Sequence, residues 1–200
     1  MKKLYLLLAI ACLVPWGCSK DSPTKTENNG NGSSSVLLPL KVGNFWEYET
    51  DGPFGQRYRY KWNVIRQISI ASEQAFVVAG AGPDTAYLVN KELGVYIYSR
   101  NRRKFELLWK YPAKVSETFV SNVDRQDYLY NTTTKSTDAS VSVPAGVFKE
   151  CVMYEQFFQL TNHTETSRVY VKPGIGFVKE EYIYSNDSPN ITELISYKVN

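Results

Sequence analysis

The side chains best suited to nucleophilic or metal chemistry are few, since the chain has one histidine, His163, and three cysteines, Cys12, Cys18 and Cys151. The pattern predicts that Cys151 lies in a strand and that His163 lies in the hairpin turn at the end of the same strand. At about 3.3 Å per residue, an unbroken strand would hold them roughly 40 Å apart, which excludes a Cys–His dyad. One histidine and one cysteine cannot supply the four ligands of a zinc site either. We therefore expect no catalytic residue, no metal and no cofactor.

The carboxylates do not change this expectation. Glu180 and Glu181 are adjacent on a predicted strand, so their side chains diverge and cannot work as an acid–base pair. Asp124 and Asp127 could offer oxygen atoms to a cation, but the rest of a calcium loop is missing. The sequence predicts a protein that is not an enzyme.

The first 18 residues carry the clearest chemical signal. Lys2 and Lys3 precede an apolar run, Leu4 to Val14, and Gly17-Cys18 follows before the chain turns polar. This is the charged, apolar, small-residue order of a secretory signal. A helix over the run would span roughly 17 Å, short of the ~30 Å hydrocarbon core of a bilayer. The segment resembles a bacterial lipoprotein signal, in which a small residue precedes the cysteine that is lipidated; a rival cleavage before Cys12 would halve the apolar region.

That resemblance implies a membrane anchor. Residues 1–17 would be the signal peptide, and Cys18 would become the N-terminal residue, carrying three acyl chains such as palmitate. Ser19 after the cysteine, rather than Asp, favours the outer membrane and leaves open which side of it the protein faces. Residues 18–35 would be the lipidated cysteine and a flexible polar tether, because the run from Ser19 has no large apolar side chain to bury.

The rest of the chain, residues 36–200, has the length of one domain with a sizeable core. Loss of Lys2 and Lys3 with the signal lowers the formal charge from +3 to +1, so no basic field is available to hold nucleic acid. With Cys12 removed and Cys18 acylated, Cys151 has no partner for a disulfide, and we expect it to be buried. We expect a monomer.

From Phe45 onward the hydrophobic pattern has period two. Tyr58, Tyr60, Trp62 and Val64 alternate with charged or polar residues, as in a half-buried antiparallel strand. Similar runs recur, separated by turn signals, and they predict about ten strands. The predicted strands after the first two lie near residues 75–78, 86–89, 95–98, 105–110, 139–143, 147–160, 167–171, 176–184 and 191–199.

A single sheet of that size must curl or split. We therefore predict an all-β antiparallel meander, forming a curved half-barrel or open barrel, with a β-sandwich as the alternative. Residues 112–135 are the least regular stretch, and we expect a short helix or a covering loop there. A transmembrane barrel is disfavoured, because the strand at 176–184 has Lys179 and Glu181 on one face and Glu180 on the other.

Three passages resemble a family of uncharacterised bacterial lipoproteins. They are LPLKVGNFWEY (38–48), VPAGVFKEC (143–151) and YVKPGIGFVK (170–179). The resemblance implies a cell-envelope address and a shared fold, but no reaction. Each passage also has a structural explanation: Pro173-Gly174 suits a type II turn, Gly176 suits a bulge or a close approach, and Trp46 and Tyr48 should seal one end of the core.

Aromatic residues are the remaining signal. The chain has 15 Tyr, 9 Phe and 4 Trp, and all but Tyr5 and Trp16 lie in residues 36–200. We expect a non-catalytic envelope protein that binds a lipid-like or other apolar ligand on a concave, aromatic-lined sheet. The alternative is an envelope module that contacts a protein or a glycan and has no small ligand. The candidate ligand-lining residues are Trp46, Tyr48, Tyr58, Tyr60 and Trp62.

Overall fold

The structure is a computed structural model that describes residues 36–51, 56–80, 85–122, 129–159, 164–184 and 189–200. The chain divides into two units, Met1–Gly32 and Ser33–Asn200. All described residues belong to the second unit, and everything below concerns that unit. Within them, no helix has the length and apolar character needed to cross a membrane.

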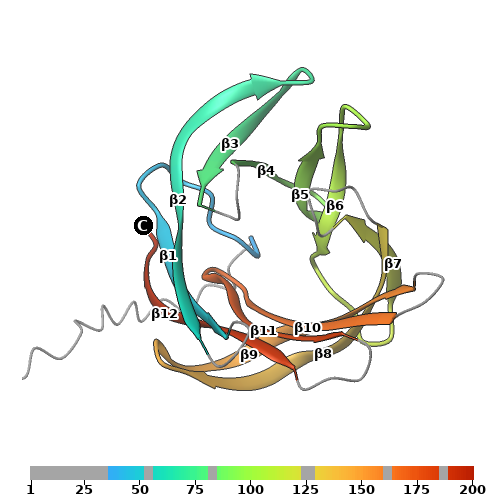
Figure 1. Cartoon of the computed structure of the whole chain (residues 1–200). Coiled ribbons are helices and arrows are strands. Elements are labelled where there is room, and N and C mark those ends of the chain that lie inside the picture. The colour runs from blue at the N-terminus through green and yellow to red at the C-terminus, as the bar shows by residue number, and fades with distance from the viewer. Residues whose placement is uncertain (1–35, 52–55, 81–84, 123–128, 160–163, 185–188) are drawn as a thin grey trace, which may run out of the picture. The chain divides into compact units, whose positions relative to one another are not determined.

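The described chain is all-β and forms one antiparallel sheet (Figure 1). Its twelve strands are β1 (Phe45–Asp51), β2 (Arg57–Ile70), β3 (Glu73–Ala79), β4 (Ala86–Lys91), β5 (Gly94–Ser99), β6 (Lys104–Lys110), β7 (Thr118–Asn122), β8 (Leu129–Val143), β9 (Gly146–Gln159), β10 (Thr164–Lys172), β11 (Gly176–Tyr184) and β12 (Asn190–Lys198).

The all-β meander is confirmed, and the strand count of about ten was close but low. The difference lies mostly in residues 112–135, where we expected a helix or a loop and the structure has β7 and the start of β8. These strands carry polar residues on both faces, so the alternation that marks a half-buried strand was missing.

The strands follow the order β6-β5-β4-β3-β2-β1-β12-β11-β10-β9-β8-β7. Ten of these eleven neighbouring pairs join strands consecutive in sequence; the remaining pair, β1 with β12, joins the two ends of the chain. The sheet curls until its two edge strands, β6 and β7, lie near each other, so it is nearly a closed barrel (Figure 1). The half-barrel prediction was close, and the sandwich alternative is wrong.

Among the described residues, no backbone ladder pairs β6 with β7. Side-chain contacts join these two edge strands instead. The Asn122 amide donates to Glu106 Oε2 across 2.7 Å. Near the other end of the edge, the Lys110 ammonium pairs with Glu117. The Tyr154 hydroxyl from β9 donates to the carbonyl oxygen of Lys110 at 2.5 Å.

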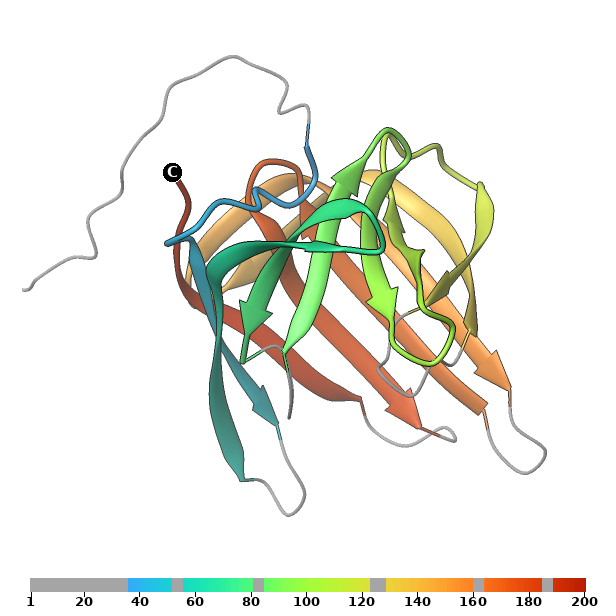
Figure 2. The same ribbon diagram turned by 90° about the horizontal axis from the view of Figure 1, so that it is seen from above.

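The core lies toward one end of the barrel, which we call the near end. The first described segment, blue in Figure 2, enters at this end, where the Val36 carbonyl oxygen accepts from the Gly174 N–H at 3.0 Å in the β10–β11 turn. Leu37 and Leu38 are buried, and Leu38 packs so closely on Gly176 that a Cβ there would lie 2.4 Å from Leu38 Cδ1. The predicted close approach at Gly176 is confirmed. The opposite, far end is where β1 meets β2 and β11 meets β12.

Two glycines with nearly equal backbone angles allow strain and collision to be separated. Gly94 has φ +130° and Gly146 has φ +136°, but a Cβ at Gly94 would lie 2.1 Å from the carbonyl oxygen of Trp109, while Gly146 has open space. We expect Gly146→Ala to cost about 1–3 kcal/mol of unfolding free energy from backbone strain. Gly94→Ala should cost at least about 2 kcal/mol more, because β5 must move away from β6. Urea unfolding of both variants measures the difference, and equal losses would contradict the close β5–β6 approach.

Candidate functional site

Aromatic ring contacts show which face of the sheet is the inside of the barrel. The Phe177 ring on β11 lies 5.0 Å from Tyr48 on β1, 5.7 Å from Trp62 on β2 and 6.3 Å from Trp109 on β6, measured between ring centroids. Since β6 and β11 are far apart in the sheet, the contact between Trp109 and Phe177 crosses the interior. Side chains that share their face with these rings therefore point inward.

The five predicted ligand-lining residues separate into three environments. Trp46 and Tyr48 are fully buried, and each donates a hydrogen bond to a backbone carbonyl oxygen, that of Ile175 at 2.6 Å and that of Phe177 at 3.1 Å. They are core residues, which agrees with the prediction that they seal one end of the core. Tyr60 and Trp62 contact Tyr48 from β2 and are half-buried.

Tyr58 is 49% exposed and its hydroxyl donates to Gln56 Oε1 at 2.5 Å. It lies on the inward face of β2 at the far end, opposite Thr50 in the register. Of the predicted set, Tyr60 and Trp62 are thus the two that keep accessible surface deeper inside the barrel.

Polar side chains form a continuous band on the inner face, on the far side of the aromatic core. The strand register places Thr132, Gln156 and Ser167 side by side on β8, β9 and β10. It also places Glu180, Thr192 and Thr50 side by side on β11, β12 and β1. We call these six residues, with Ser121 on β7 and Tyr60 on β2, the polar band. Hydrogen bonds join its members: Thr192 to Thr50 at 2.8 Å, Ser121 to Thr132 at 2.6 Å and Ser167 to Glu180 at 2.5 Å.

Gln156 is the most unusual member of the polar band. It is 0% exposed, and neither its amide nitrogen nor its amide oxygen has a hydrogen-bond partner among the described residues. The Thr134 hydroxyl on β8 and the Trp62 and Trp109 indole N–H groups share this condition. A buried polar group without a partner costs about 1–3 kcal/mol, so native proteins pair nearly all of them.

Glu180 holds a carboxyl group inside the barrel. The Ser167 hydroxyl donates to its Oε1 at 2.5 Å, and no lysine, arginine or histidine of the described residues lies within ion-pair distance. Burial raises the pKa of the Glu180 carboxyl above its usual range. Burial and then the nearby charge of Glu180 raise the pKa of the Tyr60 hydroxyl. For Tyr182, burial and Glu165 come first and Glu180 adds to the rise in pKa.

The far half of the interior is accessible to solvent. Tyr60, Trp62, Glu180 and Tyr182 all point inward, yet each is only half-buried. Phe119 on β7, whose ring centroid lies 6.0 Å from that of Tyr154, is half-buried as well. The inward groups that keep accessible surface are thus aromatic rings from β2, β7 and β11 and the Glu180 carboxyl, with Gln156, Ser167 and Thr192 buried behind them. Together these residues are the candidate site.

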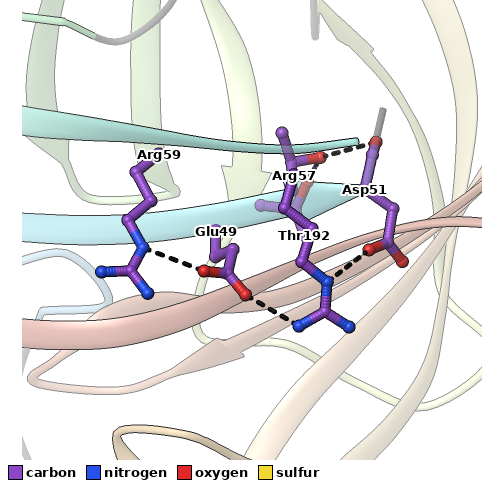
Figure 3. Close-up of polar contacts among 6 residues, drawn as sticks. Glu49, Asp51, Arg57, Arg59 and Thr192 are labelled. Atoms are coloured by element: carbon purple, nitrogen blue, oxygen red, sulfur yellow. Dashed lines mark hydrogen bonds and ion pairs between the residues drawn. The ribbon is translucent and has the colours of Figure 1, made fainter. Parts of the chain in front are cut away.

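Charged side chains are concentrated on the outer face, as β1 and β2 illustrate (Figure 3). Glu49 accepts from Arg57 at 3.0 Å and from Arg59 at 2.9 Å, and Asp51 pairs with Arg57 at 3.4 Å. The two arginines are mostly exposed, so these pairs fix the strand register more than they add stability. Each acid here faces a base, which leaves no free charge for a ligand in this cluster.

Several predicted features fall elsewhere. Cys12, Cys18, Asp124, Asp127 and His163 lie outside the described residues, so nothing in the structure bears on their roles. Cys151 is free and fully buried, as predicted. Among the described residues, no group of three potential ligands could hold a metal ion.

Glu180 and Gln156 are the residues that the sequence analysis missed as site residues. Glu180 entered it as half of a rejected acid–base pair with Glu181 and as a charge on one face of a strand, and Gln156 was not singled out. The available signal was Glu180 sharing a face with Tyr182, and Gln156 sharing one with Tyr154. Aromatic–polar alternation of this kind is also typical of a solvent-facing strand.

Comparison with known proteins identifies structures that have a similar fold. No protein-family model and no curated protein matches the chain. Two crystal structures are similar. A candidate exported protein with a YmcC-like fold from Bacteroides fragilis matches with a TM-score of 0.51 at 13% identity, over 82% of this chain and 99% of that chain. A candidate lipoprotein from Parabacteroides distasonis matches with a TM-score of 0.49 at 15% identity, over 84% and 100%. At such identities the first likeness shows a shared fold only.

The raised pKa of Glu180 predicts a pH-dependent stability. Below the unfolded-state pKa of about 4.3 the carboxyl is protonated in both states. As the pH rises, the unfolded chain loses this proton first, so the folded state loses stability. The isosteric variant Glu180→Gln should therefore gain stability relative to wild type between pH 4 and pH 7, measured by urea unfolding.

Glu181→Gln is the matched control, since Glu181 is the next residue, faces outward and pairs with Lys179 at 3.1 Å. It should lose up to about 1 kcal/mol at pH 7. A Glu180→Gln variant whose stability relative to wild type does not change with pH would contradict the buried environment of Glu180.

Proposed function

We propose that this protein is a lipid-anchored protein of the bacterial cell envelope that binds a small ligand inside its barrel and does not transform it. The observation that carries the proposal is the polar band, above all Gln156, buried with both amide atoms unpartnered. A barrel interior that served only stability would hold apolar side chains, as the near end does.

The lining of the interior favours a ligand with polar groups over a wholly apolar one. The fully apolar part of the interior, at the near end, is filled by Trp46, Tyr48, Leu38 and their neighbours. The accessible part combines the aromatic rings of Tyr60 and Trp62 with the Glu180 carboxyl, and the hydroxyl and amide groups of Ser167 and Gln156 are buried next to it. We therefore modify the expectation of a lipid-like ligand to one that is small and amphipathic.

Binding is favoured over catalysis because the Cys151 thiol, the free cysteine of the described residues, is unsuited to nucleophilic attack. Cys151 is fully buried, and burial raises the pKa of its thiol to about 11, so it stays protonated at neutral pH. Among the described residues, Glu180 is hydrogen-bonded by the Ser167 hydroxyl, and Glu165, another inward carboxylate, accepts instead from the Tyr130 hydroxyl at 3.1 Å. This arrangement favours separate roles for the two carboxylates over an acid–base pair.

The address rests on the N-terminal signal, and a labelling experiment tests it. Cells expressing the full chain are fed an alkyne-bearing fatty acid, and the protein is captured and assayed for label and membrane association. Wild type and Cys12→Ser should both be labelled, whereas Cys18→Ser should lose the label and leave the membrane fraction. Label retained in Cys18→Ser would overturn the anchor assignment.

Native mass spectrometry of the mature lipoprotein purified from membranes tests the ligand. We expect a stoichiometric adduct that is released on unfolding. Gln156→Leu should lose it by at least tenfold in occupancy, yet be more stable, because a leucine of similar size needs no partner. Gln159→Leu, on the exposed part of the same strand, is the control and should keep the adduct. Equal occupancy in wild type and Gln156→Leu would contradict binding at the polar band.

A second candidate function is an interaction module of the envelope, favoured by an apolar patch on the outer face. Val120, Leu129 and Phe157 are 53%, 45% and 39% exposed, and the register groups them around Asn131 on β8. Crosslinking in intact cells from position 157 would capture a consistent envelope partner if this function is correct.

A further inference from the structure

We propose that the ligand presents a positively charged nitrogen, an ammonium group on a small organic molecule, to Glu180 between the rings of Tyr60 and Tyr182. This inference rests on the proposed function and names the chemical class of its ligand. It is argued from the charge of Glu180, from the rings beside it and from the amide of Gln156.

The charge of Glu180 is uncompensated within the described chain, and this distinguishes it from other carboxylates of the same sheet. Glu155 on β9 faces Lys135 at 3.1 Å and Arg168 at 3.4 Å. Glu181, one residue further along β11, faces Lys179. Glu180 has only the Ser167 hydroxyl, at 2.5 Å. Glu165, a second carboxylate on the inner face, accepts from the Tyr130 hydroxyl at 3.1 Å. The chain therefore pairs Glu155 and Glu181 on the outer face with bases and leaves Glu180 for a partner from outside.

The rings around Glu180 are suited to a cation. Tyr182 lies opposite Ser167, the residue that donates to Glu180. The Tyr60 hydroxyl hydrogen-bonds Thr192, which lies opposite Glu180 in the β11–β12 register. Aromatic faces attract ammonium groups, most strongly where water is excluded. A carboxylate beside tyrosine rings is the combination used to hold quaternary and primary ammonium groups, and the half-buried Trp62 extends it.

Gln156 is the independent observation that points to a bound molecule. It lies directly opposite Ser167 in the β9–β10 register, and Ser167 in turn bonds Glu180. Its amide needs one acceptor and one donor, and among the described residues it has neither. A hydroxyl or amide next to the ammonium group of the ligand would satisfy it.

Other ligand classes fit less well. An anion would be repelled by Glu180, and a neutral sugar would leave its charge without a counterion. A metal ion would need further hard ligands, and no described cluster of His, Cys, Asp or Glu supplies them. Charge is therefore the property that a test must isolate.

Choline and its isostere 3,3-dimethylbutan-1-ol have the same shape and the same hydroxyl group, but only choline carries a positive charge. A comparison of the two therefore isolates the effect of charge on binding. Binding of each to the mature lipoprotein is measured by calorimetry and by the NMR shift of the Trp62 indole N–H. We expect choline to bind at least tenfold more tightly than the isostere. Glu180→Gln should remove at least 90% of that preference, while Glu181→Gln, which is adjacent but outward-facing, should keep it. Thermal melts of the variants check that each remains folded.

Equal affinity for choline and the isostere, no binding of choline by wild type at 10 mM, or an unchanged preference in Glu180→Gln would each overturn the inference. The proposed function fails separately. If purified wild type carries an uncharged adduct that Gln156→Leu loses, the barrel binds a ligand but not a cation. If wild type carries no adduct and binds neither probe, both proposals are wrong.

Discussion

The pairing of β1 with β12 is the constraint on which the rest of the structure depends. Every other ladder joins neighbours in sequence, whereas this one joins Phe45 to Lys198 at one end and Thr50 to Thr192 at the other. Without it the chain would be two six-stranded meanders. Closing a loop of this length carries an entropic cost that local hairpins avoid, so buried contacts around it must compensate. Trp46, Tyr48 and Leu194 are fully buried there, and Asn44 Oδ1 accepts from the backbone and side chain of Asn200, each at 3.1 Å.

This pairing also divides the barrel into two chemically different halves. Residues 36–44 lead into β1 at the near end, and Leu37 and Leu38 fill that end before the first strand begins. The same registers that place Trp46 and Tyr48 in the core place Thr50 and Thr192 beyond them, beside Glu180. Stability and the candidate site thus share the same strands, with the aromatic rings of Tyr48, Trp62 and Phe177 as the boundary between them.

The polar band is a cost to the fold, and that is the main reason to connect it with function. An unpartnered Gln156 and a buried carboxyl at Glu180 each reduce the stability of the folded chain, and apolar residues of similar size would avoid both penalties. Local violations of this kind concentrate at functional sites, where a ligand supplies the missing partner. The cell-envelope address and the cation preference are separate proposals with separate tests, and failure of one leaves the other standing.

The sequence by itself determined the all-β meander, most of its turns and the core role of Trp46 and Tyr48, because these depend on local alternation and turn chemistry. Pro173-Gly174 behaves as predicted, with Gly174 at φ +78° and the Ile175 N–H bonded to the Lys172 carbonyl oxygen at 3.0 Å. Only the tertiary structure decided which face of a mixed strand is inside. Thr132 and Thr134 on β8 and Gln156 on β9 look solvent-facing in sequence, yet closure of the sheet buries them. The β10–β11 register shifts at Tyr170 and Val171, so the alternation of inward and outward side chains on β11 changes between Phe177 and Lys179. The inward position of Glu180 therefore follows from its pairing with neighbouring strands and could not be read from the pattern of β11 alone.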